Sequence, residues 1–369
     1  MAPRPMRPFW FLLLLCFLFT LLSVTVFSAE TPTTSARSAA LYEPSRGTFL
    51  MTKNANLRMP MASTTKIMTA LVALEDCDPS TVVTVPKEAT GIEGSSLYLK
   101  EGEQMTLSDL LYGLLLRSAN DAACAIAQAV AGSVEAFVER MNQKALALGL
   151  TDTHFDNPHG LDADTHYTTA EELARIAAAA MQIPTFCTMV KTISRRIGEG
   201  DSTRLVTNHN KLLRLYDGAI GVKTGFTKKS GRCLVSAAER DGVTLIAVTI
   251  HAPNDWQDHE AMLDFGFDTV ECRTEAEIGQ YRYTVPVLDG TASEVTVENT
   301  EPFSIVMKKT DSPIRCDVRL TRYTVAPIKK GDILGTLLFS QDGELLTQLP
   351  LRAMEDVNTV QKRRRFFFF

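Results

Sequence analysis

Hydrophobic positions between residues 39 and 270 recur with a helical period in several segments. One such segment follows Thr106 (LSDLLYGLLL) and another follows Thr169 (AEELARIAAAAM). Each threonine has an acidic residue three positions later, Asp109 and Glu172 respectively. This is the capping-box spacing of a helix N-terminus. The pattern therefore predicts helices that begin immediately after these two threonines.

Two other residues mark helix ends. The segment after Ser133 (VEAFVERMNQKALAL) is helical in pattern and stops at Gly149, a residue common just after a helix C-terminus. Pro184 follows the alanine-rich segment and is expected to end it, since proline removes a backbone donor.

Between Gly221 and Ala252 the pattern changes to that of strands. CLVSAAE and VTLIAVTI are rich in small and β-branched residues, and Asp241-Gly242 lies between them. Asp-Gly between two such runs is a strong hairpin signal. GVKTGF, just before, is expected to form the preceding antiparallel strand.

After Glu277 the helical period nearly disappears. Short apolar segments (YTVPVL, SEVTV, FSIVM, CDVRL, ILGTLLF) alternate with turn signals such as Asp289-Gly290 and Asp342-Gly343. This arrangement predicts a small all-β, sandwich-like second domain. The 369 residues are also enough for two domains.

The first 28 residues have the layout of a secretory signal peptide. Arg4 and Arg7 precede an apolar run from Phe9 to about Val26, and small residues follow at a plausible cleavage site after Ser28. The run is long for a signal core, so an uncleaved membrane anchor is the alternative. Both interpretations place the rest of the chain outside the cytoplasmic membrane.

The last residues, QKRRRFFFF, combine a basic cluster with four phenylalanines. Basic side chains bind anionic lipid and aromatic rings enter the membrane interface, so the tail is expected to contact a membrane surface. A disordered tail is the alternative. The predicted organisation is a signal peptide at 1–28, a linker at 29–38, a catalytic domain at 39–275, a β domain at 276–352 and a tail at 353–369.

Composition narrows the function further. The chain is 45% hydrophobic and 22% charged, with a formal net charge of -5. Such mild acidity argues against a nucleic-acid-binding protein, which would carry a basic stripe. Six cysteines beyond Cys16 are scattered without a metal-binding spacing, and we interpret them mostly as small buried hydrophobes, with disulfides still possible after export.

The first motif with chemistry is Ser63-Thr64-Thr65-Lys66, at the start of a helical pattern. Lys66 follows Ser63 by three positions, so both side chains lie on one helix face. A neighbouring base must take the proton of a serine hydroxyl before it becomes a good nucleophile. Lysine is such a base if burial and a second cation lower its pKa. Alone, however, this motif is more typical of a helix cap than of a catalytic serine.

The second motif is Ser118-Ala119-Asn120, between two helical segments. A polar turn between helices is its structural interpretation. Its functional interpretation is a second hydroxyl for proton transfer and an amide that binds a substrate carbonyl.

The third motif is Lys223-Thr224-Gly225, on the strand before the hairpin. An exposed lysine on an edge strand is the structural interpretation. Alternatively, a buried Lys223 needs a functional reason, Thr224 can bind a carboxylate, and Gly225 allows a ligand close to the backbone.

All three motifs occur in one order and in matching contexts, and together they resemble those of penicillin-binding proteins and class A β-lactamases, with Ala119 where aspartate is common there. The segments FDNPHGLD, HYTTAEELA and NHNKLL and the trailing β domain add to this likeness. The chain resembles the low-molecular-mass penicillin-binding proteins, the serine-type D-alanyl-D-alanine carboxypeptidases. The resemblance implies an α/β (α+β) catalytic domain with an antiparallel sheet and a helical subdomain.

The resemblance also implies roles. Ser63 would be the nucleophile and Lys66 its proton acceptor, while Ser118 would relay a proton to the leaving D-alanine. The substrate-binding residues would be Asn120, Lys223, Thr224, Gly225, Phe226 and, near the substrate carboxylate, His209. The backbone N–H groups of Ser63 and Phe226 would form the oxyanion hole. The substrate would be a peptidoglycan stem ending in D-Ala-D-Ala, β-lactams would be covalent inhibitors, and no cofactor would be needed.

Several alternatives remain. A D,D-endopeptidase would use the same acylation chemistry. A class A β-lactamase needs a deacylating glutamate that the window around residues 154–164 does not contain. A wall-binding module without activity would have no reason to keep all five polar motif residues. His154, His159 and His166 lack the spacing of a helical metal-binding pair, and we interpret them as loop histidines with ordinary hydrogen-bond partners. His251 and His259 receive the same interpretation.

Overall fold

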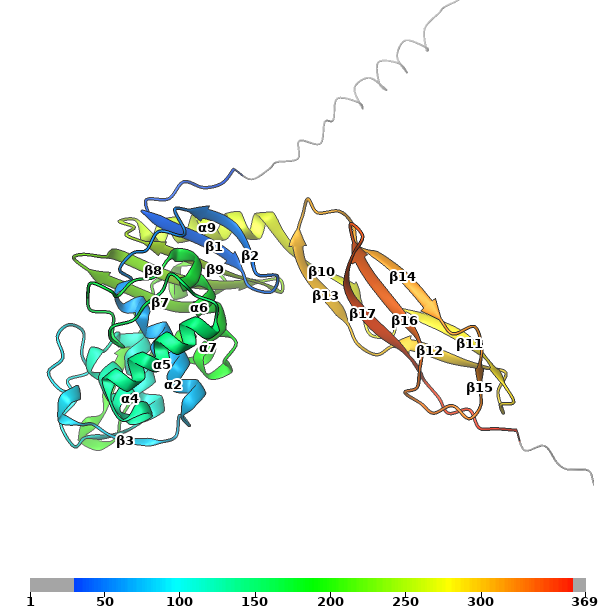
Figure 1. Cartoon of the computed structure of the whole chain (residues 1–369), viewed down its shortest axis with the longest axis horizontal. Helices are drawn as coiled ribbons and strands as arrows, with labels where there is room; N and C mark the ends of the chain where they lie inside the picture. The colour runs from blue at the N-terminus through cyan, green and yellow to red at the C-terminus, as the bar shows by residue number, and fades with distance from the viewer. Residues whose placement is uncertain (1–29, 361–369) are drawn as a thin grey trace, which may run out of the picture. The chain divides into compact units, whose positions relative to one another are not determined.

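The computed structural model describes residues 30–360 (Figure 1). The predicted signal peptide at 1–28 and the basic and aromatic end of the tail, 361–369, lie outside the described residues. Residues 34–37 of the predicted linker pack into the catalytic domain, since Ala36 is buried and both Ser35 N and Ser35 Oγ donate to Asp258.

A five-stranded antiparallel sheet forms the centre of the catalytic domain. Its strands lie in the order β2-β1-β9-β8-β7. Their bounds are β1 Ser38–Glu43, β2 Thr48–Lys53, β7 Ala219–Thr227, β8 Gly231–Arg240 and β9 Val243–Ile250. The hairpin between β8 and β9 is confirmed, with Asp241 and Gly242 both at positive φ, as a two-residue turn requires. β7 pairs antiparallel with β8, also as predicted.

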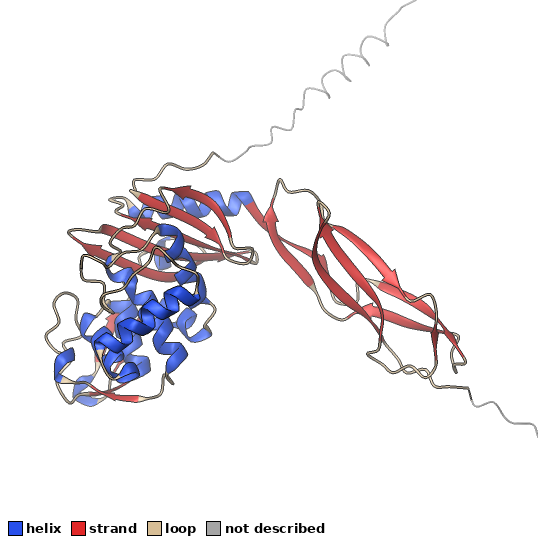
Figure 2. Cartoon of the chain, viewed as in Figure 1, coloured by secondary structure: helices blue, strands red, loops and turns tan. Residues whose placement is uncertain are grey.

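Helices cover both faces of this sheet (Figure 2). Their bounds are α2 Lys66–Asp76, α3 Leu107–Tyr112, α4 Asn120–Ala131, α5 Val134–Ala147, α6 Ala170–Met181, α7 Pro184–Lys191, α8 Leu212–Leu215 and α9 Asp255–Thr269. The helices α2 through α7 and one face of the sheet together form a large apolar core. A second core, with Met262 and Leu263 of α9, covers the other face.

Helix starts follow the predicted capping residues. The side chains of Thr106, Ser133 and Thr169 accept from backbone N–H groups at the starts of α3, α5 and α6. Pro184 differs from the prediction, because α6 already ends at Met181 and Pro184 opens α7. Proline fits there because the backbone N–H of a first-turn residue, which proline lacks, has no intrahelical acceptor.

Two short hairpins flank the helical region. They are β3 Val82–Thr84 with β4 Gln104–Thr106, and β5 Ser194–Ile197 with β6 Arg204–Thr207. The long loop between β3 and β4, and the hairpin β5–β6, both lie beside the site described below.

The C-terminal region is all-β, as predicted. The strands are β10 Val270–Ala276, β11 Arg282–Leu288, β12 Glu294–Asn299, β13 Phe303–Lys308, β14 Arg315–Leu320, β15 Thr324–Val325, β16 Ile333–Gln341 and β17 Glu344–Ala353. Six of them form a sheet in the order β14-β16-β17-β12-β11-β15, and β10 pairs with β13. A separate apolar core includes Phe339, Leu351 and Val357. Since Val357 is buried there, the first part of the predicted tail belongs to this domain.

Within residues 30–360, no single helix is long and apolar enough to cross a membrane, and only two sharply bent helix pairs, α4 with α5 and α6 with α7, pass that test by length and composition. The six cysteines of this part of the chain are free, with Cys124 and Cys233 buried and the others half-buried.

Candidate active site

The three motifs meet at one cavity of about 330 Å³. Ser63, Ser118, Thr224, Gly225 and Phe226 all line it, together with Ser95, His209, Arg232, Asp255 and Trp256. A larger cavity of about 830 Å³, lined partly by α6, α7 and β9, contains none of the motif residues. The chemistry predicted from the sequence therefore concentrates in the smaller cavity.

Ser63 lies in a 3₁₀ turn, Ala62–Thr65, that leads directly into α2. The preceding residue, Ala62, has φ of 50°, a left-handed conformation that costs an L-residue about 1–2 kcal/mol. Lys66, one turn later, is fully buried. Its Nζ is 2.9 Å from Ser63 Oγ, so the predicted contact between nucleophile and base is present.

The other two partners of Lys66 decide what its amine can do. Nζ also contacts Asn120 Oδ1 at 2.7 Å and the His159 carbonyl oxygen at 2.5 Å. Those two oxygens can only accept hydrogen bonds. A neutral Lys66 amine therefore gives its two hydrogens to them and directs its lone pair at the Ser63 hydroxyl.

Burial and the nearby Lys223 ammonium both hold the pKa of Lys66 well below its usual value. Both causes favour the neutral amine, which is the form that can accept a proton. Because Lys66 has no carboxylate among its hydrogen-bond partners in the described chain, no anion offsets this effect at contact distance.

Lys223 stands on the edge strand β7 but is only 2% exposed. The structural interpretation was an exposed lysine on an edge strand. The strand position agrees with it, but the side chain is buried instead of exposed. Nζ donates to Ser118 Oγ at 3.0 Å and to the Thr224 carbonyl at 2.8 Å. Burial lowers the pKa of Lys223 to about 7. Two buried lysines thus each contact one serine hydroxyl.

Ser118 lies between a π-helical turn, Gly113–Arg117, and α4. Its φ of 63° is again left-handed, and this conformation interrupts the helix where its side chain reaches Lys223. Strained non-glycine residues cluster at functional sites when the surrounding structure imposes them. Ala62 and Ser118 both fit this pattern.

Asn120 opens α4 with a side chain bonded at both ends. Oδ1 accepts from Lys66, and Nδ2 donates to the Glu93 carbonyl at 2.5 Å. An amide nitrogen carries two hydrogens, so one remains for a substrate carbonyl. Asn120 is buried and does not line the cavity, and its contact orients Lys66, a role that the sequence did not predict.

Strand β7 approaches the Ser63 turn closely at Gly225. A Cβ built at Gly225 would lie 3.0 Å from Ser63 N and 3.1 Å from Thr64 N, which explains glycine at this position. Phe226, the next residue, is 66% exposed, and its side chain lies at the cavity rim. The close approach places the backbone of β7 beside the backbone of the nucleophile turn.

His209 also lines the cavity, as the sequence suggested. Its Nε2 is 3.4 Å from Arg117 Nη1, which has hydrogens only to donate, so Nε2 accepts. Partial burial, Lys223 and Arg117 together lower the pKa of His209. A neutral His209 can donate to a ligand only from its other ring nitrogen.

The loop of residues 154–168 supports the nucleophile, which the sequence reasoning missed. His159 supplies the carbonyl to Lys66, and Pro158 supplies one to Thr69 Oγ1 at 2.6 Å. Gly160, with φ of 90°, lies so close to Ala62 that a Cβ would be 2.0 Å from its carbonyl oxygen. FDNPHGLD was recognised only as a family segment, and its Pro-His-Gly sequence was the available signal.

Both ring nitrogens of His166, in the same loop, have hydrogen-bond partners, as predicted, and one partner is Thr65 of the nucleophile turn. Its Nδ1 accepts from the Asp156 backbone N–H at 3.0 Å, so Nε2 carries the proton and donates to Thr65 Oγ1 at 2.8 Å. Burial lowers the pKa of His166 to about 4 and keeps this neutral form. No group of three metal-binding side chains is found among residues 30–360.

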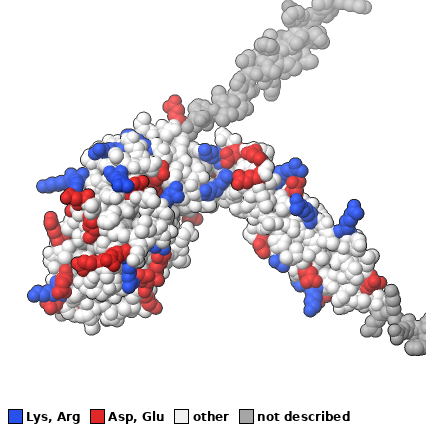
Figure 3. Space-filling view, viewed as in Figure 1, with Lys and Arg blue, Asp and Glu red and all other residues white. Residues whose placement is uncertain are grey.

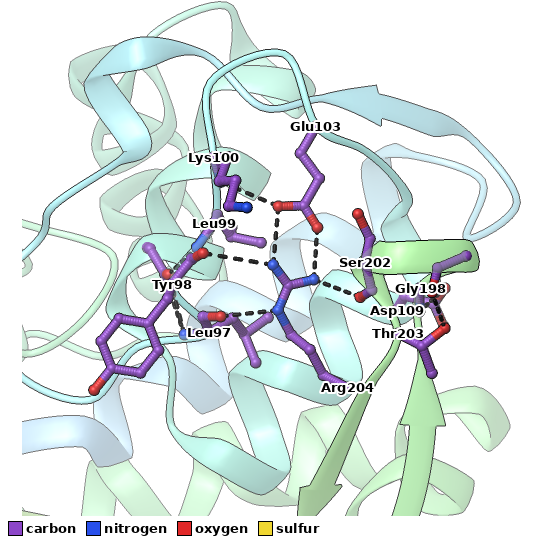
Figure 4. Close-up of polar contacts among 12 residues, drawn as sticks. Leu97, Tyr98, Leu99, Lys100, Glu103, Asp109, Gly198, Ser202, Thr203 and Arg204 are labelled. Atoms are coloured by element: carbon purple, nitrogen blue, oxygen red, sulfur yellow. Dashed lines mark hydrogen bonds and ion pairs between the residues drawn. The ribbon is translucent and has the colours of Figure 1, made fainter.

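The loop before β4 contributes Ser95 to the cavity lining. Asp121 of α4 and Arg204 of β6 both hold this loop in place. Buried Asp121 accepts from the backbone N–H of Leu97 and Leu99. Arg204 of β6 donates to the Leu97 carbonyl at 2.9 Å and forms a two-pronged ion pair with Glu103 (Figure 4). The loop in turn gives the Ser95 carbonyl to Asn120 N and the Glu93 carbonyl to its side chain.

Comparison with known proteins agrees with this geometry. Residues 25–254 match the family model described as D-alanyl-D-alanine carboxypeptidase, peptidase S11. Residues 273–359 match that of the penicillin-binding protein 5 C-terminal domain. Both matches together account for the two folded regions.

Individual relatives cover most of the chain. D-alanyl-D-alanine carboxypeptidase DacF of Bacillus subtilis is 34% identical over 87% of this chain and 86% of its own length. D-alanyl-D-alanine carboxypeptidase DacC of Escherichia coli is 33% identical over 92% of this chain and 90% of its own length. Penicillin-binding protein 5 of Haemophilus influenzae has a similar structure, with a TM-score of 0.66, 27% identity, and coverage of 89% of this chain and 99% of that one.

Proposed function

The chain belongs to the D-alanyl-D-alanine carboxypeptidase family, as a serine peptidase with a penicillin-binding-protein fold, and we propose that it acts through an acyl-enzyme on Ser63. The reaction is removal of the terminal D-alanine from peptidoglycan pentapeptide stems. The observation that carries this proposal is the contact of buried Lys66 with Ser63 Oγ and with two oxygens that only accept.

In the acylation step, neutral Lys66 takes the Ser63 proton as Oγ attacks the carbonyl of the penultimate D-alanine. The backbone N–H groups of Ser63 and Phe226 stabilise the oxyanion, at about 3 kcal/mol each. The closeness of Gly225 to Ser63 N supports this assignment, because it brings the two N–H groups to one side of the nucleophile.

Release of D-alanine requires a proton on its amine. Ser118 is suited to give it, since its hydroxyl lines the cavity and Lys223 donates to its oxygen. Lys223, with a pKa near 7, can replace the proton that Ser118 gives away. Lys66, whose pKa is held well below its usual value, loses the Ser63 proton to solvent once D-alanine has left. The neutral amine then accepts a proton from the water that attacks the ester, and it returns this proton to Ser63 Oγ as the acyl group leaves.

The remaining cavity residues bind the stem. Thr224 lines the cavity with a hydroxyl that can bind the terminal carboxylate. Asn120 is buried, and we assign the substrate carbonyl to the amide hydrogen that the Glu93 carbonyl does not use. A β-lactam carries the same acyl and carboxylate groups, so it is expected to acylate Ser63. His209 contributes at the carboxylate end.

We place the enzyme on the outer side of the cytoplasmic membrane. The apolar segment of residues 1–28 supports export, and the basic and aromatic end of the tail supports contact with a membrane surface. On the face that Figure 3 shows, acidic and basic side chains are interspersed, so this surface offers nucleic acid no basic stripe.

Labelling with a fluorescent penicillin tests the nucleophile. The wild-type protein should become labelled and Ser63→Ala should not, with Ser312→Ala of the β domain as a control hydroxyl outside the cavity. Labelling of the Ser63→Ala protein would show that another residue is acylated.

Release of D-alanine from a purified pentapeptide stem tests the reaction. Free D-alanine from the monomeric stem, without cleavage of cross-linked dimers, identifies a carboxypeptidase. Cleavage of dimers alone would identify an endopeptidase, and rapid hydrolysis of benzylpenicillin would identify a β-lactamase.

A further inference from the structure

The peptide unit between Ala62 and Ser63 carries one of the two N–H groups assigned to the oxyanion hole. Its carbonyl belongs to Ala62, its N–H belongs to Ser63, and the bond between them is trans. A trans peptide is planar, so its C=O and its N–H point in opposite directions. Any contact that fixes the Ala62 carbonyl therefore also fixes the direction of the Ser63 N–H.

A buried chain of hydrogen bonds ends on this carbonyl. Thr65 Oγ1 donates to the Ala62 oxygen at 2.7 Å, and His166 Nε2 lies 2.8 Å from the same Thr65 hydroxyl. The carbonyl can only accept, so it takes the one hydrogen of the hydroxyl, and the hydroxyl accepts in turn from the Nε2–H of His166. Hydrogen bonds in such a chain polarise one another. Thr65 and His166 are 1% and 3% exposed, so the chain is shielded from solvent.

His166 itself is held in one orientation. Its Nδ1 accepts from the Asp156 backbone N–H at 3.0 Å, which leaves the ring proton on Nε2. Burial lowers the pKa of His166 to about 4, so the ring is neutral at pH 7 and donates to Thr65. The ring also packs edge-on against Phe155, with centroids 5.8 Å apart. The imidazole is therefore a rigid donor at one end of the chain.

The nucleophile turn needs this support because its backbone is strained. Ala62 has φ of 50°, and a left-handed residue persists only where the surrounding structure imposes it. Gly160, from the same loop as His166, packs against the same two groups. A Cβ at Gly160 would lie 2.0 Å from the Ala62 oxygen and 2.8 Å from Thr65 Oγ1. The loop thus contacts the strained turn at the atoms where the hydrogen-bond chain ends.

We propose that His166 is a positioning residue of the oxyanion hole, which acts through Thr65 on the Ala62–Ser63 peptide and directs the Ser63 N–H at the developing oxyanion. The inference rests on the proposed function, because it concerns the transition state of acylation at Ser63. His166 belongs to none of the three motifs and does not line the cavity. Its contribution is therefore to the stabilisation of the transition state and not to the binding of the substrate.

Two substitutions of His166 separate the roles of its two ring nitrogens. His166→Gln has an amide N–H near the position of Nε2 and can still donate to Thr65. His166→Asn has an amide oxygen near the position of Nδ1 and can still accept from the Asp156 N–H, but it is too short to reach Thr65. The Asn variant should lose about tenfold in kcat, part of the roughly 10²–10³-fold effect of losing an oxyanion-hole donor. The Gln variant should retain most of the wild-type kcat.

A D-Ala-D-Ala peptide and a boronic acid analogue of its acyl part provide the readout. The boron binds Ser63 Oγ and becomes tetrahedral, so the affinity of the analogue follows the stabilisation of the transition state. In His166→Asn, the Ki of the analogue should rise by the same factor by which kcat falls. KM should stay unchanged, because acylation and deacylation both pass through an oxyanion and slow together. A loss of packing alone would not produce this proportionality.

Thr65 provides an independent test of the same chain. Thr65→Val keeps the shape and removes the hydroxyl, so it should reproduce the loss of His166→Asn, and Thr65→Ser should restore most of the rate. Because both residues act in one chain, Thr65→Val with His166→Asn should lose no more than Thr65→Val alone. Should His166→Asn not fold, the two Thr65 variants carry the same comparison of kcat with Ki.

His154 provides a matched control in the same loop. Its Nδ1 contacts the Thr165 carbonyl oxygen at 2.9 Å and does not reach the nucleophile turn. His154→Gln should therefore match the wild type in kcat and in the Ki of the boronic acid.

Equal losses in His166→Asn and His166→Gln would overturn the proposal, since the bond to Thr65 would then not matter. A fall in kcat without weaker binding of the boronic acid would overturn it as well, and so would an unchanged kcat in His166→Asn. Failure of the proposed function is distinguishable: in that case the wild type would release no D-alanine from the peptide, or Ser63→Ala would release it at the wild-type rate.

Discussion

The catalytic domain and the C-terminal β domain bury different kinds of side chain. Residues 38–269 bury two lysines, three aspartates, one glutamate and two histidines along with many hydroxyl and amide groups. Residues 270–360 bury almost only apolar side chains, with Glu298, Asn299 and Gln341 as the buried polar exceptions. Burying an unpaired charge is costly, so a domain keeps such groups only where something compensates for them.

This difference separates function from stability. Around Ser63, burial lowers the pKa of the lysines and left-handed residues position the hydroxyls, at a cost to the fold. In the β domain, Phe303, Tyr281 and Phe339 pack ring against ring and stabilise the fold without any such cost. Each variant below changes one side of this comparison.

Replacing the buried base should have the largest effect. Lys66→Met keeps the volume and removes the proton acceptor, so acylation by fluorescent penicillin should slow by about 10²–10⁴-fold. Stopped-flow labelling measures this. Lys87→Met changes an exposed lysine of the same domain and should label at the wild-type rate. Wild-type labelling of Lys66→Met would exclude Lys66 as the base.

Removing a core ring from the β domain should change stability alone. Phe339→Ala should lower the free energy of unfolding of that domain by about 3–5 kcal/mol, because it creates a cavity in a fully buried site. Calorimetry measures the loss, and Leu345→Ala is the exposed control on β17. Acylation of Ser63 should proceed at the wild-type rate. A parallel fall in acylation would show that the two regions are not energetically separate.

Loosening the cavity wall should have an intermediate effect on activity. Arg204→Ala removes the ion pair with Glu103 and the bond to the Leu97 carbonyl, so the loop that supports Asn120 loses one of its two anchors. Because misplaced substrate-binding groups cost up to about 10²-fold, kcat/KM should fall by roughly tenfold or more. Arg196→Ala on the same hairpin is the control. An unchanged kcat/KM would assign the positioning to Asp121 alone.

The smallest expected effect concerns stability against pH. Folding lowers the pKa of Lys223 from 10.5 to about 7, so the unfolded chain binds more protons between these values. Stability must therefore rise with pH across that window, by at most about 1.4 kcal/mol per unit. Lys223→Met should be at least as stable as the wild type at pH 7 and lack this part of the rise. Urea unfolding at pH 7, 8 and 9 measures the difference; identical slopes would mean that Lys223 is not the group responsible.

Local patterns predicted local structure well. Thr106, Ser133 and Thr169 cap helices, and Asp241-Gly242 turns the hairpin, because each of these residues acts on backbone within a few positions. Pro184 shows where such a pattern is ambiguous. The same fixed φ that ends one helix also suits the first turn of the next.

The sequence by itself determined which residues to bring together: Ser63, Lys66, Ser118 and Lys223 stand in three motifs whose order and contexts resemble those of a serine acyl-transfer site, and these side chains contact one another in two pairs. Only the tertiary structure decided how these groups are tuned. The His159 carbonyl reaches Lys66 across 93 residues, and Arg204 reaches the Leu97 carbonyl across 107. Such contacts depend on packing between distant segments, and no periodicity or spacing encodes them. The same holds for His166, which reaches Thr65 across 101 residues.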